Sequence, residues 1–345
     1  MAIVFDAPVA PDTLTEYVRT LPTPSGLKLL DLFPITNSAS NEINLAETTR
    51  TNRVARFRAF DGRIHVADRD GMSTSKVQMA PFSDSLNMGE YERLQLEFAR
   101  TGGTRIGALA DAIYNDADAL HRNMLNRIEM ALGDVLADGV FNPGLRSEFG
   151  GVLDFGVDAA SKPTAAKAWT DPTADVLGDL IAWADAAEKA TGVRPATVLG
   201  SRDMLRRLNT NTGLINAIKG AQTGSTRVSA AEVADLFAGE GLPTNFVAYD
   251  TQLDVDGTAT RVLPADKLVL LPPNPGDMLE FRLGISATAL ELVDSNEAEM
   301  SFEQSAGIVG VVEKIGPPYR QFTFIDAVGL PVLKDSRQLF VADVA

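Results

Sequence analysis

The sequence predicts an α+β fold for this chain of 345 residues. One observation is a very long amphipathic segment over residues 104–138, and another is a shorter helical segment over 170–192. The third is a series of short apolar runs after residue 245, which is typical of strands. Because these elements do not alternate regularly as strand and helix, the pattern favours separate helical and sheet regions over a parallel βαβ architecture.

Composition excludes several classes of chemistry. Hydrophobic residues at 45% and charged residues at 22% are ordinary for a folded protein. The chain has no cysteine, so a disulfide framework, a thiolate nucleophile and a thiolate metal site are impossible. With only His65 and His121, a histidine-rich metal centre is also excluded, and we expect no cofactor.

Charge and hydropathy restrict the environment of the protein. The first residues, MAIVFDAPVAPD, have neither a basic start nor a long apolar run, so we expect no secretory signal. No apolar run approaches the ~20 residues that a membrane helix needs. The net charge of −15 disfavours adhesion to nucleic acid or to anionic membranes. We therefore expect a soluble protein made in a cytoplasm.

Residues 1–48 are predicted to form an arm that lies along another surface. The run DTLTEYVRTL is compatible with a short helix capped by Asp12, and LPTPSG ends it. Prolines interrupt the whole segment, at Pro8, Pro11, Pro22, Pro24 and Pro34.

Residues 50–80 are predicted to form a β-hairpin. Their side chains alternate in character, and Asp61-Gly62 and Asp70-Gly71 are turn signals. Neither face of this ribbon is strongly apolar, and a two-stranded ribbon is marginally stable alone in water. It therefore needs a partner surface, unless it is simply a solvated surface hairpin.

This hairpin segment is cationic within an acidic chain. From Arg50 to Lys76, seven cations and three aspartates give a net +4, which leaves −19 for the rest of a chain whose total is −15. If the partner is another copy of the chain, the charges are complementary. The candidate contact residues are the cations and the histidine of this segment: Arg50, Arg53, Arg56, Arg58, Arg63, His65, Arg69 and Lys76.

Residues 104–138 are predicted to form one helix about 50 Å long at ~1.5 Å per residue. Thr104 can cap its start, and Gly139 suits its end. Polar residues, Glu129 among them, line one side, and apolar residues recur every three or four positions on the other. The expected core face consists of Ile106, Leu109, Ile113, Leu120, Met124, Ile128 and Val135. So long a helix serves as a spine to which other elements attach.

A second helix is predicted within residues 170–192. Thr170 or Asp171 can cap it, Pro172 falls in its first turn, and Gly192 ends it. Further along, RPATVLGSRDMLRRL predicts a strand, a turn and a helix.

The last third of the chain begins with one more helix and then turns to strands. Ser229 and Glu232 form a capping box before that helix. The expected strands are NFVAYD, ATRVLP, KLVLLP, MLEFRLG and ALELVD, followed by others in the last 45 residues.

No motif specifies a reaction. LDVDGTAT resembles the opening of a calcium loop, but Leu263 stands where that loop requires glutamate, so a hairpin turn is favoured. There is no phosphate-binding loop, and Asp203 replaces the second glycine of a nucleophile elbow. His121 is interpreted as a surface or interface residue, because a catalytic base needs an orienting carboxylate. We therefore expect no enzyme and assign no catalytic, cofactor or metal residue.

The order of these parts resembles the major capsid proteins of tailed bacteriophages, in particular the lambda-type phage major capsid protein E family. The likeness extends over roughly residues 25–345. The stretches that carry it are NRIEMALGDVLADG, GVLDFG, WTDPTADVLGDL, GVRPATVLGS, VAYDTQLDVDGTATRVLPADKLVLLPP and GPPYRQFTFIDAVGLPVLKDSRQLFVADV.

The resemblance implies the Hong Kong 97 capsid fold. Residues 1–48 would then be the N-terminal arm and 49–86 the extended E-loop. Residues 87–165 and 306–345 would form the peripheral domain with its spine helix, and 166–305 the axial domain.

The resemblance also implies a structural role. Copies of the chain would assemble into hexamers and pentamers of an icosahedral shell enclosing double-stranded DNA, with the E-loop on an acidic face of a neighbour. Implied partners are scaffold, portal and decoration proteins, with no sequence-specific DNA contact and no membrane. The protein would be assembled in the host bacterial cytoplasm and reside in the virion.

Two alternatives remain at this point. One is a soluble α+β enzyme with an unrecognised site, and the other is an encapsulin, a compartment of the same fold that packs enzymes. In the type member of the fold, an E-loop lysine links covalently to a neighbour. Lys76 lies near the end of the loop rather than at its tip, and no matching asparagine or glutamate is assigned, so we expect no cross-link.

Overall fold

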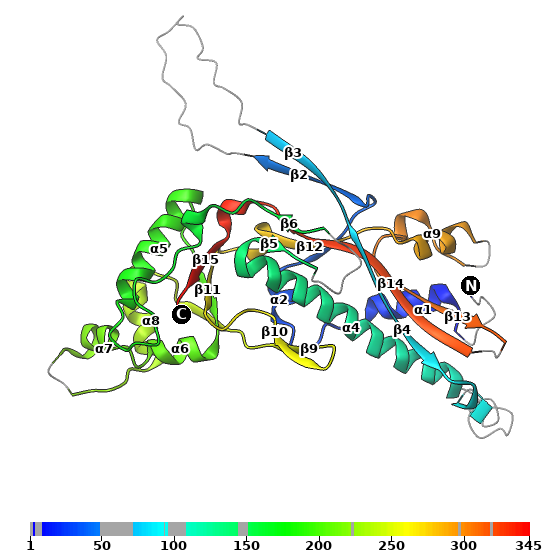
Figure 1. Cartoon of the computed structure of the whole chain (residues 1–345), viewed down its shortest axis with the longest axis horizontal. Coiled ribbons are helices and arrows are strands. Elements are labelled where there is room, and N and C mark those ends of the chain that lie inside the picture. The colour runs from blue at the N-terminus through cyan, green and yellow to red at the C-terminus, as the bar shows by residue number, and fades with distance from the viewer. Residues whose placement is uncertain are drawn as a thin grey trace, which may run out of the picture.

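The chain folds into an elongated molecule with two lobes (Figure 1). The computed structural model describes residue 3 and the ranges 9–48, 72–92, 94–95, 108–143, 151–221, 224–295, 298–317 and 320–345. The spine lobe contains a five-stranded sheet and the long helix α4 (Ala108–Asp138). The compact lobe contains a four-stranded sheet with helices against it. Helices and sheets are mixed without βαβ periodicity, so the predicted α+β class is confirmed.

The sheet of the spine lobe is organised around its longest strand. Its strands are β1 (Ile35–Asn37), β12 (Leu279–Leu283), β14 (Arg320–Leu333), β13 (Val309–Ile315) and β4 (Ala80–Met88). β14 pairs antiparallel with β4 along one edge, and with β13 and then β12 along the other. β1 adds to β12 in parallel. One strand of fourteen residues thus pairs with three others, and β12 joins β1 to them.

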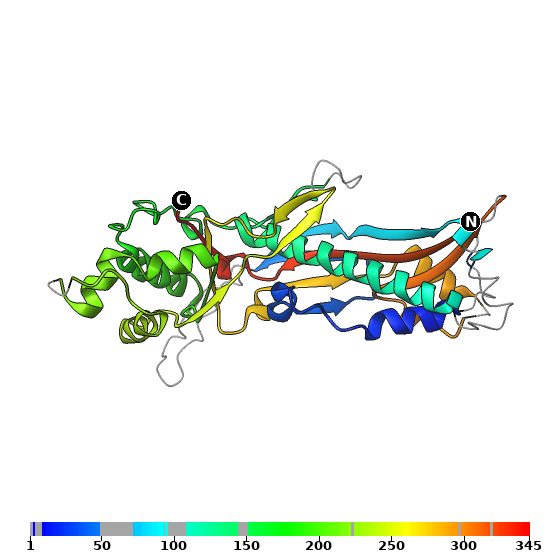
Figure 2. The ribbon, with the colours of Figure 1, turned by 90° about the horizontal axis from the view of Figure 1, so that it is seen from below.

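Helix α4 lies along one face of this sheet (Figure 2). The apolar residues expected on its core face and described by the structure are at most 4% exposed: Leu109, Ile113, Leu120, Met124, Ile128 and Val135. Ile106 and the expected cap Thr104 lie outside the described residues. Gly139 adopts a left-handed φ of +79°, and its N–H donates to the carbonyl oxygen of Val135 at 2.8 Å, which ends the helix as predicted.

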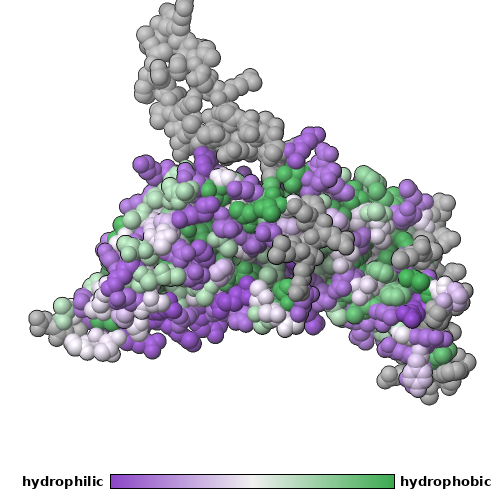
Figure 3. Space-filling view, viewed as in Figure 1, coloured by the Kyte–Doolittle hydropathy of each residue, from purple (hydrophilic) through white to green (hydrophobic). Residues whose placement is uncertain are grey.

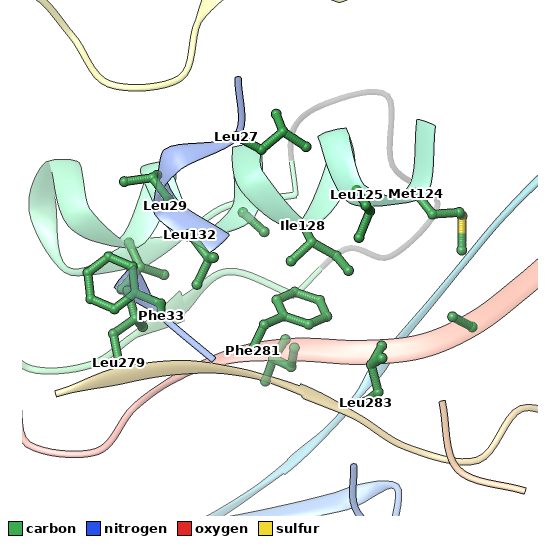
Figure 4. Close-up of a cluster of buried hydrophobic side chains, with 14 of the residues drawn as sticks. Leu27, Leu29, Phe33, Met124, Leu125, Ile128, Leu132, Leu279, Phe281 and Leu283 are labelled. Atoms are coloured by element: carbon green, nitrogen blue, oxygen red, sulfur yellow. The ribbon is translucent and has the colours of Figure 1, made fainter. Parts of the chain in front are cut away.

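The N-terminal segment belongs to the core of the spine lobe, in contrast to the expected arm. Leu29 of α2 (Lys28–Leu32) and Phe33 after it are fully buried among Ile128 and Leu132 of α4 and the ring of Phe281 (Figure 4). The prolines interrupt the segment without preventing its apolar residues from collecting on one side. The place of this segment in the core depends on strand pairing and on packing against residues far away along the chain, so the local sequence does not indicate it.

Helix α1 (Pro11–Thr20) packs on β13 of the same sheet. Leu14 and Val18 are fully buried, and a Cβ added to Gly310 would lie 3.2 Å from Leu14, so a glycine there permits the close approach. Asp12 is not the cap that was predicted, because the helix begins at Pro11 after Ala10. Its carboxylate instead accepts from the backbone N–H of Glu299 at 3.2 Å.

The sheet of the compact lobe separates two cores. Its order is β15 (Phe340–Asp343), β11 (Lys267–Leu271), β7 (Thr197–Gly200) and β8 (Asn245–Ala248). Successive residues of a strand point to opposite faces. In β11, Leu268 and Leu270 therefore join the core of the compact lobe, while Val269 and Leu271 join the core around α4. The two lobes are thus packed together through this sheet.

Four helices accompany the compact sheet: α5 (Val176–Thr191), α6 (Arg202–Leu208), α7 (Thr212–Lys219) and α8 (Ala230–Gly239). The capping box of Ser229 and Glu232 is confirmed at α8.

The predicted start of the second helix is wrong. α5 is capped by Asp175, whose carboxylate accepts from the N–H of Gly178 at 3.1 Å. Thr170, Asp171 and Pro172 precede the helix in a turn, because a nearer capping residue is available. The end is confirmed, since Gly192 has a left-handed φ of +75°.

Three two-stranded ribbons complete the described part of the fold. They pair β2 (Glu42–Thr48) with β3 (Met72–Gln78), β5 (Val140–Phe141) with β6 (Leu153–Asp154), and β9 (Gln252–Val255) with β10 (Thr258–Arg261). The turn between β9 and β10 is made by Asp256 and Gly257, both at positive φ, so the predicted hairpin is confirmed at the segment that resembled a calcium loop.

One predicted strand is a helix. ALELVD lies in α9 (Ala287–Asp294), and the side chain of Ser286 caps it by accepting from the N–H of Ala289 at 3.1 Å. Ala289 and Leu292 are fully buried, three residues apart, as a helix requires.

The lobes do not divide at the expected boundaries. β12 lies within the expected axial range 166–305, yet it pairs in the spine sheet. β15 lies within 306–345, expected to return to the peripheral domain, yet it pairs with β11 in the compact sheet. Strand pairing between distant segments decides to which lobe a strand belongs, and this pairing cannot be predicted from the order of the strands along the chain.

Candidate assembly surfaces

The ribbon of β2 and β3 projects from the body of the molecule (Figure 1). Seven residue pairs, from Glu42 with Gln78 to Thr48 with Met72, form its antiparallel ladder. The ladder begins at Glu42, so the hairpin starts before the expected boundary at residue 49. A two-stranded ribbon is marginally stable alone in water, and contact with another surface stabilises it.

The root of this hairpin is fixed to the body by one side chain. Asn41 donates from Nδ2 to the carbonyl oxygen of Ile285, and its Oδ1 accepts from the N–H of the same residue, both at 2.7 Å. The N–H of Met79 bonds to the carbonyl oxygen of Asn41 at 3.0 Å. The direction in which the hairpin leaves the body is therefore set by a short hydrogen-bonded network.

One of the predicted contact residues is described by the structure. Lys76 is exposed and pairs with Glu42 across the hairpin at 3.3 Å. A pair this exposed contributes only ~0–1 kcal/mol. The other predicted contact residues lie outside the described residues: Arg50, Arg53, Arg56, Arg58, Arg63, His65 and Arg69.

A groove of about 510 Å³ lies beside the root of the hairpin. Its lining includes Glu42, Lys76 and Val77 of the hairpin, and Val152 and Leu330 of the body. Val152 is exposed, so the groove combines a charged rim with apolar surface. It does not converge polar groups as a catalytic pocket does.

The two faces of the spine sheet differ in what covers them. Directly paired residues of neighbouring strands point to the same face. Gly310 and Ile325 are such a pair and face α1 and α4. Val309 and Asp326 are another pair on the opposite face, which we call the outer face, and α9 lies there, since Thr288 donates to Asp326 at 2.7 Å.

The described residues cover only part of the outer face. Farther along it, Phe322 and Phe324 remain partly exposed, with ring centroids 5.9 Å apart. In the space-filling view, hydrophilic and hydrophobic residues lie interspersed over the visible face of the molecule (Figure 3).

A buried carboxylate, missed by the sequence analysis, joins three segments. Glu129 of α4 is fully buried, although helical periodicity placed it on the polar side. Its Oε1 accepts from the N–H of Leu29 at 3.0 Å and from the hydroxyl of Tyr249 at 2.6 Å, and Oε2 accepts from the N–H of Leu30 at 3.1 Å. Burial raises the pKa of Glu129, and these hydrogen bonds partly oppose the shift.

His121, interpreted from the sequence as a surface or interface residue, is buried within the subunit. It is 8% exposed on α4, and its Nδ1 has no hydrogen-bond partner. Burial lowers the pKa of its imidazole, so the neutral form is favoured. Its position one residue from the core stripe, after Leu120, is the signal that was available in the sequence.

The described part of the chain contains no group of three or more histidine, aspartate or glutamate residues suited to a metal ion. Among the described helices, none has the length and apolar character needed to cross a membrane.

Comparison with known proteins places this geometry in a family. The phage major capsid protein E family matches residues 10–298. No curated protein matches the chain. The prediction of family from the sequence is confirmed.

Two solved structures share the architecture. A protein assigned as the capsid protein of a prophage (E. coli CFT073) has a TM-score of 0.59 and 14% identity, covering 95% of this chain and 97% of its own. A phage-related protein from Bordetella bronchiseptica RB50 has a TM-score of 0.54 and 15% identity, covering 100% and 98%. At these identities the similarity shows a common fold, and the predicted Hong Kong 97 type is confirmed.

Proposed function

Because the chain belongs to the phage major capsid protein E family, we propose that its copies assemble into the hexamers and pentamers of an icosahedral shell that encloses double-stranded DNA. The observation that carries the proposal is the family match over residues 10–298, which includes parts of both lobes. The role is structural, and the protein resides in the virion.

The two lobes suit different places in a ring of subunits. We assign the compact lobe to the axial position near the centre of each capsomer, and the spine lobe to the periphery. A ring of identical subunits uses head-to-tail contacts, so each subunit must present two different, complementary surfaces. The projecting hairpin of β2 and β3, together with residues 49–71 between these strands, supplies one of the two surfaces.

The charge distribution supports contact between copies. The cations of 50–69 belong to a chain whose net charge is −15, so a neighbour attracts them. Each exposed pair contributes only ~0–1 kcal/mol, but the contact recurs at every subunit and fixes register. The overall acidity also limits adhesion of the shell to the DNA it encloses.

Other partners follow from the same role. A scaffold protein would guide closure in the bacterial cytoplasm, a portal would replace one pentamer for DNA entry, and a decoration protein would bind the finished shell.

Electron microscopy of the purified chain tests the proposal. We expect a large species in size-exclusion chromatography and closed shells in negative stain. A compact monomer that never assembles, alone or with a scaffold, would overturn it. Nuclease-resistant DNA in native particles supports a virus shell, whereas a packed enzyme in place of DNA contradicts it.

A further inference from the structure

The hairpin of β2 and β3 is joined to the body by two short connections. β3 ends at Gln78 and β4 begins at Ala80, so a single residue separates the projecting ribbon from the spine sheet (Figure 1). The other connection, residues 38–41, links β1 to β2. The twist of a two-stranded ribbon varies widely, so these connections alone do not fix the direction of the hairpin.

The side chain of Asn41 supplies the missing constraint. Its amide both donates to and accepts from the backbone of Ile285, and a residue of a neighbouring antiparallel strand would make the same two hydrogen bonds. Asparagine is suited to this double contact because its side chain carries a donor and an acceptor. We call Asn41 and Ile285 the hairpin joint.

The glycine at position 284 leaves room for the hairpin joint. A Cβ added to Gly284 would collide with Oδ1 of Asn41 and would lie 2.8 Å from the sulfur of Met79. Met79 is the residue between β3 and β4, so both connections of the hairpin meet at this point. A side chain at position 284 would therefore push the hairpin away from the body.

Ile285 can hold the hairpin because the returning chain holds Ile285. This residue forms an antiparallel bridge with Ala306, and the N–H of Gly307 donates to the carbonyl oxygen of Gly284 at 3.0 Å. The side chain of Ile285 is buried in a small apolar cluster at α9. The position of the hairpin joint thus depends on the position of residues 306 and 307.

Arg19 of α1 fixes the returning chain. Its guanidinium donates to three carbonyl oxygens, those of Gln304, Ala306 and Ile308, at 2.7, 3.3 and 2.9 Å. The planar fork of a guanidinium holds its donors in fixed directions, so these three bonds define the path of the backbone between them. A continuous series of contacts therefore runs from Arg19 through Ala306 to the hairpin joint.

We infer that Arg19, acting through residues 304–307 and the hairpin joint, is a positioning residue that sets the direction of the hairpin of β2 and β3 for assembly. The inference rests on the proposed function, in which this hairpin supplies one of the two contact surfaces. It adds that a residue remote from that surface decides how the surface is presented. A hairpin already held in one direction does not have to be ordered when it binds a neighbour, which lowers the cost of each contact.

Distances between two spin labels measure the direction of the hairpin in unassembled subunits. The chain has no cysteine, so labels can be attached selectively at Ser73→Cys in β3 and at Arg122→Cys, an exposed position of α4. We expect one narrow distance distribution for the otherwise wild-type protein. Asn41→Ala and Arg19→Ala should each broaden or shift this distribution, because each removes a link between the body and the hairpin.

The matched control is Arg194→Ala. Arg194 also ties segments together, since it donates to the carbonyl oxygen of Gly241 and pairs with Asp185 and Glu188, but it lies in the compact lobe and not in the series of contacts that leads to the hairpin joint. Arg194→Ala should lower the melting temperature, as Arg19→Ala does, and leave the distance distribution unchanged. The comparison separates the positioning of the hairpin from a general loss of stability.

Gly284→Ala is a second, independent variant, because it crowds the hairpin joint while leaving Asn41 and Arg19 in place. It should also shift the distance distribution. In assembly assays, Asn41→Ala, Arg19→Ala and Gly284→Ala should each lower the yield of closed shells by roughly tenfold, because a loosely held hairpin must be ordered at every contact. Arg194→Ala should retain the yield of the wild type.

The outcomes distinguish the inference from the proposed function. An unchanged distance distribution in Arg19→Ala, or the same broadening in Arg194→Ala, overturns the inference and leaves the proposed function intact. Wild-type protein that forms no shells overturns the proposed function and, with it, the role of the hairpin joint in assembly.

Discussion

Glu129 shows how one residue can hold distant segments together. Its carboxylate accepts hydrogen bonds from α2 and from Tyr249, at the end of the compact sheet, while its own backbone belongs to the spine helix. Glu129→Ala would leave three buried donors without an acceptor, and we expect a loss on the order of 3 kcal/mol in the free energy of unfolding. Urea denaturation of unassembled subunits measures it.

The matched control is Tyr249→Phe, which removes one donor and preserves the ring. We expect a loss of about 1 kcal/mol. Equal stability of wild type and Glu129→Ala would show that the buried carboxylate does not join the segments.

The same carboxylate gives stability a pH dependence. Burial raises the pKa of Glu129 above its ordinary value of 4.5, so between the two values the folded state binds more protons than the unfolded state. Its contribution is fully present below the ordinary value and is lost as pH rises through the raised pKa. Relative to Glu129→Gln, which does not titrate, the wild type should therefore lose stability as the pH increases from the ordinary pKa to the raised one. Thermal melts of both proteins from pH 4 upwards measure the difference, and parallel profiles would contradict it.

Helical periodicity describes the apolar core face of α4 well, but it cannot predict whether every residue beside that face is buried or exposed. It predicts the buried positions from Leu109 to Val135, which depend on spacing alone. It places Glu129 on the polar side, yet this residue is buried, because its hydrogen-bond partners Leu29 and Tyr249 lie 100 and 120 residues away along the chain. Such tertiary neighbours leave no local trace.

At the scale of elements, α4 has a position where another segment of the chain approaches the helix too closely for a side chain to fit. A Cβ at Gly133 would lie 2.6 Å from the carbonyl oxygen of Val262, in the connection between β10 and β11. A backbone carbonyl cannot move away cheaply. Gly133→Ala should therefore lower the melting temperature, although alanine favours a helix by about 1 kcal/mol.

Gly239, in α8, is the matched control for that substitution. No atom lies within 4 Å of a Cβ added there, and its φ is not positive. Gly239→Ala should leave the melting temperature unchanged or raise it. A more stable Gly133→Ala variant would show that the contact with Val262 is not tight.

Sequence patterns predict elements where the signal is local. The capping box at Ser229 and the Asp256-Gly257 turn are specified by adjacent residues. In ALELVD the apolar residues fit a strand or a helix equally well, and the deciding residue, Ser286, lies outside the run. The places of β12 and β15 depend on partners across the chain, so no local signal assigns them to a lobe.

At the scale of the whole molecule, the cationic segment should matter for assembly and not for folding. The triple variant Arg53→Glu, Arg56→Glu and Arg58→Glu changes cations of the predicted E-loop, and we expect the subunit to fold normally, because a two-stranded ribbon adds little to a core. It should form no closed shells in negative stain, because the neighbour is acidic.

The control keeps the charge and changes the side chain, with lysine at the same three positions. We expect it to assemble, with a lower yield if planar arginine contacts contribute. Normal shells from the glutamate variant would show that these arginines are not the assembly contact.

Salt separates the two forces that can hold one copy to the next. Screening shortens electrostatic attraction from about 10 Å at 0.1 M salt to about 3 Å at 1 M, so a contact made by exposed arginines and carboxylates weakens over this range. An apolar contact does not weaken in that way. Light scattering during assembly of purified subunits should therefore show slower growth and a lower plateau as sodium chloride rises. The lysine variant should follow the same trend, because its charge is equal. Assembly that is unaffected by salt would mean that apolar contacts, and not charge, hold one copy to the next.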